Sequence, residues 1–230
     1  MFRVHTNNVM KKIALLAAAF LIGGTAANAQ TTTSTVGTTK WGLKVGVNLA
    51  KYSFGNDDGD NPTTDHATNF HVTGYLDLPV GSMFSVQPGL SLQGKGAEFS
   101  DDANFEVKDN TMWLEVPVNL VGKIPLGATG TSLFLGAGPY AAFGLSGERQ
   151  TTDKILNTET ERDFEFGDES GDDLKALDFG VNFTGGIQLN SGFNIGAGYG
   201  LGLTDLRPSG SGGNGQINNR VISFSVGYAF

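Results

Sequence analysis

Large apolar residues alternate with small or polar residues along most of this chain. In residues 41–50, for example, Trp, Leu and Val occupy every odd position, and Gly, Lys, Asn and Ala occupy the even ones. This period of two predicts β-strands. It recurs in eight segments: 40–54, 67–79, 82–99, 105–122, 131–146, 174–189, 192–205 and 217–230.

The connections between these segments alternate in length. Short links at 80–81, 123–130 and 190–191 are rich in Gly, Pro, Asn and Ser, which favour turns. The other links are longer and polar: 55–66, 100–104, 147–173 and 206–216. This alternation predicts an antiparallel meander with both termini on the side of the short turns.

Two architectures fit eight antiparallel strands: a soluble lipocalin-like calyx with its apolar face inward, and a membrane barrel with that face outward. The small, polar face favours the membrane barrel, because four glycines on one strand suit a narrow interior better than a water-facing sheet. They are Gly196, Gly198, Gly200 and Gly202. We therefore predict an all-β, eight-stranded, up-and-down transmembrane β-barrel with short periplasmic turns and long extracellular loops.

The N-terminus has the pattern of an export signal. Lys11 and Lys12 precede the apolar run 13–22, and Ala27 and Ala29 form a small-residue cleavage motif that ends at residue 29. Ten apolar residues are too few for the roughly 20 of a membrane-spanning helix. We expect residues 1–29 to be a cleaved signal peptide with Met10 as its natural start, followed by a polar segment 30–39 and a barrel domain 40–230. Cleavage would lower the 15 basic residues to 12 and leave all 23 acids, for a net charge of −11.

A closed barrel must pair its last strand with its first, since an open edge would expose backbone groups to lipid. The pairing would gather aromatic residues at the inner interface as a girdle. The predicted girdle consists of Trp41, Phe84, Phe193, Tyr228 and Phe230.

The final strand also carries Phe224, Tyr228 and Phe230 in alternation, and this ending is similar to the C-terminal signal read by the machinery that inserts outer-membrane barrels. Several stretches resemble the PorT-like outer-membrane β-barrel family of Bacteroidetes, of the OmpA/OmpX-like eight-stranded type. They are WGLKVGVNLA, LDLPVGSMFSVQPGLSLQGKG, LEVPVNLVGKI, LGAGPYAAFGLSG, NIGAGYGLGLTDL and NRVISFSVGYAF. The resemblance implies a fold and an outer membrane, and by analogy a role as an accessory to secretion.

Five charged residues fall on the predicted inward face: Lys44, Asp77, Lys95, Glu115 and Asp178. Unpaired charges in a narrow, dry lumen are costly, so we expect them to pair. The predicted pairs are Lys44 with Asp77 and Lys95 with Glu115. Such pairs would plug the lumen, and the alternative is the lining of a narrow pore for small solutes.

The chain offers little chemistry for catalysis or for cofactors. It has no cysteine, and its acidic balance argues against nucleic acid as a partner. His66 and His71 could belong to a lipid-modifying site, but one is predicted in a loop and the other inward. Residues 56–61 are acidic but lack the register of a calcium loop. We expect the protein to have no catalytic activity, no cofactor and no metal site.

Residues 147–173 hold ten acidic and three basic residues. Such runs are commonly disordered, so a mobile solvated loop is the first interpretation. The second is a loop that binds an extracellular or envelope partner, because binding residues often lie on loops of a rigid scaffold. Other expected partners are outer-membrane lipid, lipopolysaccharide and the barrel-assembly machinery.

Overall fold

The computed structural model describes residues 37–55, 64–102, 105–156, 158–169, 171–211 and 215–230. The predicted signal peptide and the acidic stretch 56–61 lie outside these residues. The chain divides into two units, Met1–Thr35 and Val36–Phe230, and all described residues belong to the second. Its elements are β1 (Lys40–Gly55), β2 (Ala67–Pro79), β3 (Phe84–Asp102), β4 (Phe105–Pro125), η2 (Gly127–Thr129), β5 (Ser132–Asp153), β6 (Thr158–Asp163), β7 (Leu177–Gln188), β8 (Phe193–Gly202) and β9 (Gln216–Ala229).

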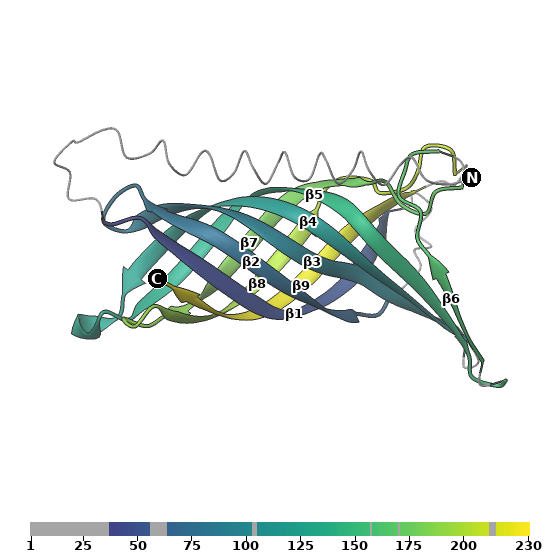
Figure 1. Ribbon diagram of the computed structural model, residues 1–230, viewed down its shortest axis with the longest axis horizontal. Helices are drawn as coiled ribbons and strands as arrows, with labels where there is room; N and C mark the ends of the chain where they lie inside the picture. Colours follow the sequence, from purple (N-terminus) through teal and green to yellow (C-terminus); the bar gives the residue numbers. More distant parts are fainter. Residues whose placement is uncertain (1–36, 56–63, 103–104, 157, 170, 212–214) are drawn as a thin grey trace. The chain divides into compact units, whose positions relative to one another are not determined.

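Eight of these strands form a closed antiparallel ring. The order around it is β4-β3-β2-β1-β9-β8-β7-β5, and pairing of β4 with β5 closes it (Figure 1). Each predicted strand corresponds to one ring strand, and the predicted closure of the last strand on the first is present. Gly42 pairs with Ala229 and Gly55 with Gln216, so β1 and β9 are joined along almost their whole length.

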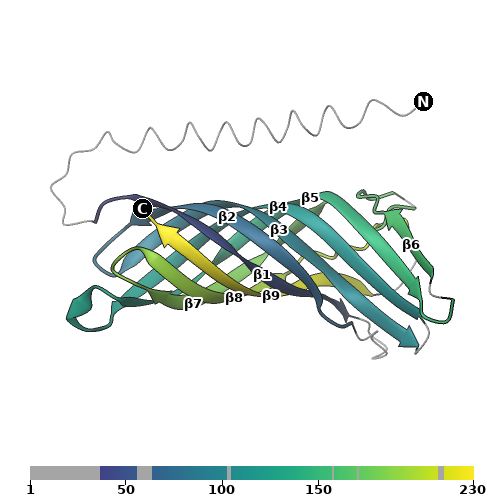
Figure 2. The ribbon, with the colours of Figure 1, turned by 60° about the horizontal axis from the view of Figure 1, so that its bottom comes forward.

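The ring has two different ends. The connections β2–β3, β4–β5 and β7–β8 are short and lie at the end where β1 begins and β9 ends (Figure 2). We call this the short-turn end and the opposite one the long-loop end. No helix among the described residues is long and apolar enough to cross a membrane.

The apolar face of the ring points outward. Every second residue of β1 from Trp41 to Val47 is exposed, as are Phe70, Phe183 and Phe224 on other strands. The polar positions between them point inward: Asn48, Asp178 and Asn219 are buried. The interior of the ring is therefore polar, and its apolar outer belt is suited to contact with lipid. A soluble calyx has the reverse arrangement.

The glycines of the inward face make room for aromatic rings. A Cβ built at Gly186 would meet the ring of Phe134 at 2.7 Å, and one at Gly144 would meet the ring of Phe166 at 2.6 Å. Contacts this short require the neighbour to shift, so a larger residue at either glycine would displace a lumen ring. The glycine-rich pattern is therefore complementary to a few bulky inward side chains.

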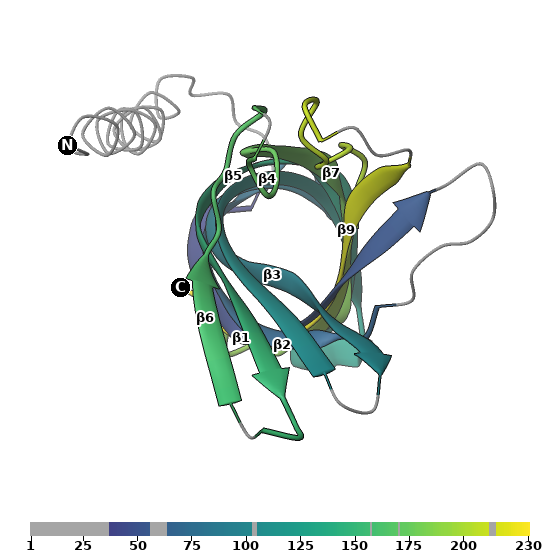
Figure 3. The same cartoon turned by 90° about the vertical axis from the view of Figure 1, so that its right-hand side faces the viewer.

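Strands β3, β4 and β5 continue past the ring at the long-loop end, where β6 joins them. Phe105 of β4 pairs with Asp153 of β5, and Asp153 in turn pairs with Thr158 of β6. Figure 3, a view along the ring, shows the β3–β4 and β5–β6 hairpins projecting beyond it. We call the projecting parts of β3–β6 the outer sheet. The sequence predicted a loop over 147–173, but β5 extends to Asp153 and β6 forms a ninth strand within this range.

Candidate functional site

A buried ion-pair cluster lies in the lumen. Lys95 Nζ is 3.1 Å from Glu115 Oε2 and 3.1 Å from Asp178 Oδ2. All three residues are at most 3% exposed. The structure thus brings together three of the five charged residues that the sequence placed inside, with one ammonium between two carboxylates.

Neutral groups add hydrogen bonds to this cluster, while the buried Asp178 Oδ1 has no partner among the described residues. Asn182 Nδ2 donates to Glu115 Oε1 at 2.9 Å, and Asn219 Nδ2 donates to Asp178 Oδ2 at 2.8 Å. The Tyr140 hydroxyl donates to the same Asp178 oxygen at 3.2 Å, and the Tyr140 ring lies 4.5 Å from Lys95 Nζ. Asn182, Asn219 and Tyr140 were not among the site residues expected from the sequence. Their inward position in the alternation was the only signal for them.

The pairing expected for Lys44 and Asp77 is not formed. Asp77 instead accepts hydrogen bonds from Lys123 and from Gln87 Nε2, the latter at 3.1 Å. Lys44 Nζ lies over two rings, 4.6 Å from the centre of Tyr75 and 5.6 Å from that of Phe134. The backbone register explains the difference. Lys44 pairs with Thr73, four residues from Asp77, which at about 3.4 Å per residue places the two backbones roughly 14 Å apart along the strand.

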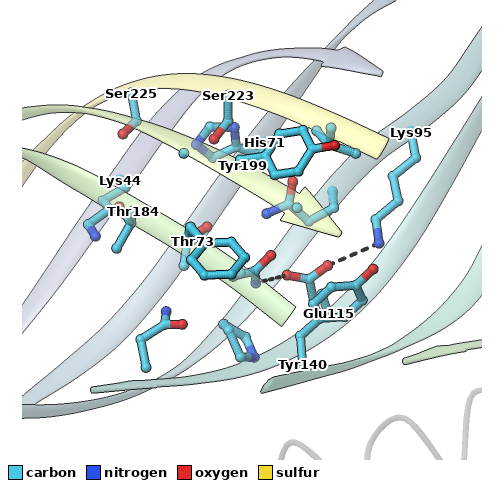
Figure 4. Close-up of a pocket in the computed structure, with 18 residues that line it drawn as sticks. Lys44, His71, Thr73, Lys95, Glu115, Tyr140, Thr184, Tyr199, Ser223 and Ser225 are labelled. Atoms are coloured by element: carbon cyan, nitrogen blue, oxygen red, sulfur yellow. Dashed lines mark hydrogen bonds and ion pairs between the residues drawn. The ribbon is translucent and has the colours of Figure 1, made fainter. Parts of the chain in front are cut away.

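A cavity of about 100 Å³ lies between Lys44 and the ion-pair cluster. In Figure 4, Lys44 and Thr184 lie on one side of it, and Lys95 and Glu115 lie on the opposite side. Hydroxyl and amide side chains make up much of the remaining lining. A cavity of this size in a polar lumen has room for several water molecules.

An apolar cluster occupies the lumen at the long-loop end. Its buried members come from the ring and from the connections after β6 and β8: Tyr52, Ala97, Trp113, Tyr140, Ala142, Phe164, Leu174 and Leu206. The rings of Trp113 and Phe166 are 5.3 Å apart in an edge contact. We call this group the mouth cluster. It lies next to the ion pairs, because Tyr140 belongs to it and Lys95 Nζ is 5.6 Å from the Trp113 ring.

Two forked ion pairs lie near the mouth cluster: one joins β6 to the segment after it, and the other joins β5 to β4. Arg162 donates to both carboxylate oxygens of Asp173, at 2.9 and 2.6 Å, and Arg149 makes the same forked contact with Asp109 at 2.6 and 2.7 Å. Burial raises the pKa of Asp173, but the Arg162 guanidinium and the Glu165 backbone N–H outweigh it and hold that pKa below its ordinary value. Asp173 is therefore ionised at neutral pH and fastens the segment.

The two histidines do not form a site. His71 is buried in the lumen, where its Nδ1 lies 2.8 Å from Asn48 Oδ1, whereas His66 is exposed. Within the described part of the chain, no group of three or more His, Asp or Glu residues is arranged to hold a metal ion.

The predicted girdle residues all lie on the outer face at the short-turn end. Trp41, Phe84, Phe193, Tyr228 and Phe230 are exposed there. Trp41 and Phe230 stack with ring centres 3.8 Å apart and an interplanar angle of 10°. Phe230 N also donates to Trp41 O at 2.8 Å, so the last residue is fixed by both a ring and a backbone contact.

A closed ring of eight antiparallel strands with an apolar outer belt, a polar interior and exposed aromatic residues at one end defines a membrane-spanning β-barrel. The family model described as "Outer membrane protein beta-barrel domain" matches residues 28–207, and the chain belongs to this family. Family membership assigns the barrel to an outer membrane.

Several solved barrels are similar in fold. Ail of Yersinia pestis is 13% identical over 84% of this chain and 100% of its own, with a TM-score of 0.41. Neisserial surface protein A is 8% identical over the same shares, with a TM-score of 0.43. OprG of Pseudomonas aeruginosa is 14% identical over 84% of this chain and 96% of its own, with a TM-score of 0.39. No curated protein matches the chain by sequence.

Proposed function

We propose that this protein is a non-enzymatic outer-membrane barrel with a plugged lumen, and that it presents the outer sheet to an envelope or extracellular partner. The observation that supports this proposal is the outer sheet itself. Three ring strands extend beyond the barrel to build it, and β6 adds a strand whose six residues are all exposed. Among the described residues, no strand pairs with the far edge of β6.

One face of the outer sheet is acidic. Cross-strand neighbours share a face, so the registers Glu98–Lys108–Gln150–Glu161 and Asn110–Glu148–Asp163 lie on the same side. Glu106 and Glu159 continue this side, which carries six carboxylates against Lys108 and the Glu106-bound Lys154. The opposite side carries the buried Asp109 and Ala97. The acidic side therefore faces away from the mouth cluster and suits a basic partner surface.

The proposal of a plugged lumen is supported by two layers of inward side chains. The Lys95 cluster fills one level of the lumen with paired charges, and the mouth cluster fills the next with apolar side chains. An eight-stranded barrel has an interior that side chains can fill. In planar lipid bilayers we expect no conductance steps from the purified protein, whereas steady unitary currents would establish the narrow-pore alternative.

We also propose an orientation of the barrel in the outer membrane. The signal peptide would be cleaved after Ala29, both barrel termini would be periplasmic, and the outer sheet would face the exterior. Phe224, Tyr228 and Phe230 would serve the assembly machinery as the insertion signal, and the outer sheet would lie beside lipopolysaccharide. A PorT-like origin in Bacteroidetes and a role as an accessory to secretion are supported only by the sequence motifs.

The absence of cysteine allows a direct test of this orientation. Thr160→Cys places one thiol on β6, and Ser82→Cys places one in an exposed short turn. A membrane-impermeant maleimide added to intact cells should label the first variant and spare the second until the outer membrane is opened. The reverse labelling pattern would refute the orientation.

A third cysteine tests partner binding. A thiol-directed cross-linker on Thr152→Cys, which lies on the acidic side between Glu106 and Glu159, should give a discrete adduct in intact cells, and Glu159→Gln with Glu161→Gln should weaken it. Absence of any adduct would count against the partner role. Alanine at His66 and His71 should leave lipid A unchanged, and altered lipid A would instead support the enzyme alternative.

A further inference from the structure

The lumen cavity separates two groups of charges. On the side of Lys44, the charged residues are Lys44, Lys123 and Asp77, and Asp77 is bound to Lys123. Among the described residues, no carboxylate lies within 4.0 Å of Lys44 Nζ. One positive charge on this side therefore lacks a contacting counter-ion.

The opposite side of the cavity has an excess of one negative charge. Lys95 is shared by Glu115 and Asp178, so two carboxylates face one ammonium. Glu115 lines the cavity and accepts from Lys95 through Oε2 and from Asn182 through Oε1. A carboxylate has about four acceptor positions, so Glu115 keeps capacity for a further donor.

The lining between these two sides offers further hydrogen bonds. The buried Asn119 Oδ1 has no partner among the described residues and belongs to the same lining as Thr73 and Ser225. A buried acceptor without a partner is destabilising, so a bound molecule or water is expected to satisfy it. The volume of about 100 Å³ holds several water-sized groups, at roughly 10–15 Å³ each.

We propose that this cavity binds a small zwitterion of the size of glycine. Its carboxylate lies at Lys44 Nζ and its ammonium at Glu115, with the hydroxyl and amide groups between them. A simple anion would neutralise Lys44 but leave the excess negative charge on the Glu115 side of the cavity. A simple cation would neutralise the Glu115 side but leave the positive charge of Lys44. A zwitterion satisfies both sides and adds no net charge to the lumen.

Equilibrium dialysis of the full-length barrel, purified in detergent, against radiolabelled glycine tests this proposal. We expect retention of about one glycine per barrel. Unlabelled glycine should displace the label at least tenfold more effectively than acetate or methylammonium, and phenylalanine should not displace it. Lack of retention would overturn the proposal, as would displacement by acetate or methylammonium alone at the concentration at which glycine acts.

Variants then test the two sides separately. Lys44→Met and Glu115→Gln should each lower retention at least tenfold, while Lys40→Met, an exposed lysine at the start of β1, should leave it unchanged. The shift of the folded barrel in unboiled SDS gels reports whether each variant is folded. If a variant does not fold, competition on the unaltered protein still decides the question. The outcome is independent of the partner role of the outer sheet, which the cell-surface labelling tests.

Discussion

Replacement of Lys95 by methionine is the sharpest perturbation of the lumen. Methionine keeps an unbranched apolar stem but removes the ammonium from between Glu115 and Asp178, each 3.1 Å away. Both carboxylates then remain buried without a cation in contact. Their remaining donors, Asn182, Tyr140 and Asn219, are neutral.

The expected loss of stability follows from the cost of a broken buried ion pair. Removing one partner of a buried pair costs about 3–5 kcal/mol, because the other charge stays desolvated. Here one substitution strands two carboxylates, so a loss of at least about 4 kcal/mol is expected. With a urea dependence of about 2 kcal/mol per molar, the unfolding midpoint should fall by about 2 M.

Urea unfolding of the barrel reconstituted in lipid vesicles measures this loss. Trp113 fluorescence is a suitable probe, since its ring lies 5.6 Å from Lys95 Nζ. The control Lys40→Met should not move the midpoint. A variant that adds Glu115→Gln and Asp178→Asn to Lys95→Met should recover more than half of the loss, because no buried charge remains unpaired. A midpoint for Lys95→Met within 0.3 M (roughly 0.6 kcal/mol by the same slope) of the unaltered protein would refute the reasoning.

Two further predictions concern the ends of the barrel. The pKa of Asp173 is depressed in the folded state, so its contribution to stability is present above the unfolded-state value near 4 and is lost as the pH falls through the folded value. As the pH is lowered, limited pepsin digestion should therefore begin to cut at Phe164 and Phe166 at a higher pH in Asp173→Asn than in the unaltered protein. Asp163→Asn serves as the control. Cutting that begins at the same pH in Asp173→Asn and the unaltered protein would contradict the fastening role of Asp173. Phe230→Ala should lower the free energy of unfolding by about 0.5–1.5 kcal/mol in addition to the loss from reduced buried area, because it removes the ring that stacks on Trp41. Phe230→Ala should also slow the appearance of the heat-modifiable form during insertion. Ile155→Ala, which alters an exposed residue outside the ring, is the control, and equal rates for the two variants would argue against this role of Phe230.

The ring and its two faces were predictable because the membrane imposes them. Lipid demands an apolar residue at every outward position, and the lumen of a narrow barrel demands small or polar residues at every inward one. Each of the eight predicted strands corresponds to a ring strand. The alternation alone assigned Phe224 of the last strand to the outward face, and its side chain is exposed there.

The partners of the lumen charges were only partly predictable. Alternation assigns a residue to a face but does not fix its height along the barrel, which depends on the register between strands. Lys95 and Asp178 are 83 positions apart in the sequence and still meet. Lys44 and Asp77 lie on adjacent strands, yet their register separates them by four residues. Lys123 was not considered a partner, because the short link was expected to begin at that residue, whereas β4 continues to Pro125.

The outer sheet was missed for a different reason. Beyond the membrane both faces of a sheet meet water, so the apolar alternation that reveals the ring strands disappears. The six residues of β6 are all polar, and its ladder with β5 comes from backbone hydrogen bonding between polar strands. The charge density of residues 147–173 favoured disorder in the sequence analysis, but the same charges form pairs such as Arg162 with Asp173.

Residues 147–173 therefore combine two roles that composition alone does not separate. Their carboxylates supply much of the acidic face of the outer sheet, while Phe164 and Phe166 turn into the lumen mouth. Gly144 and Gly147 of β5 make this possible, since a Cβ at Gly144 would meet the Phe166 ring at 2.6 Å and one at Gly147 would meet the Phe164 Cβ at 2.8 Å. Under the proposed function, a partner on the acidic face would bind the same stretch of chain that supplies Phe164 and Phe166 to the mouth cluster. Arg162 joins the two parts of this stretch, because it lies on β6 and donates to both carboxylate oxygens of Asp173 in the segment that follows.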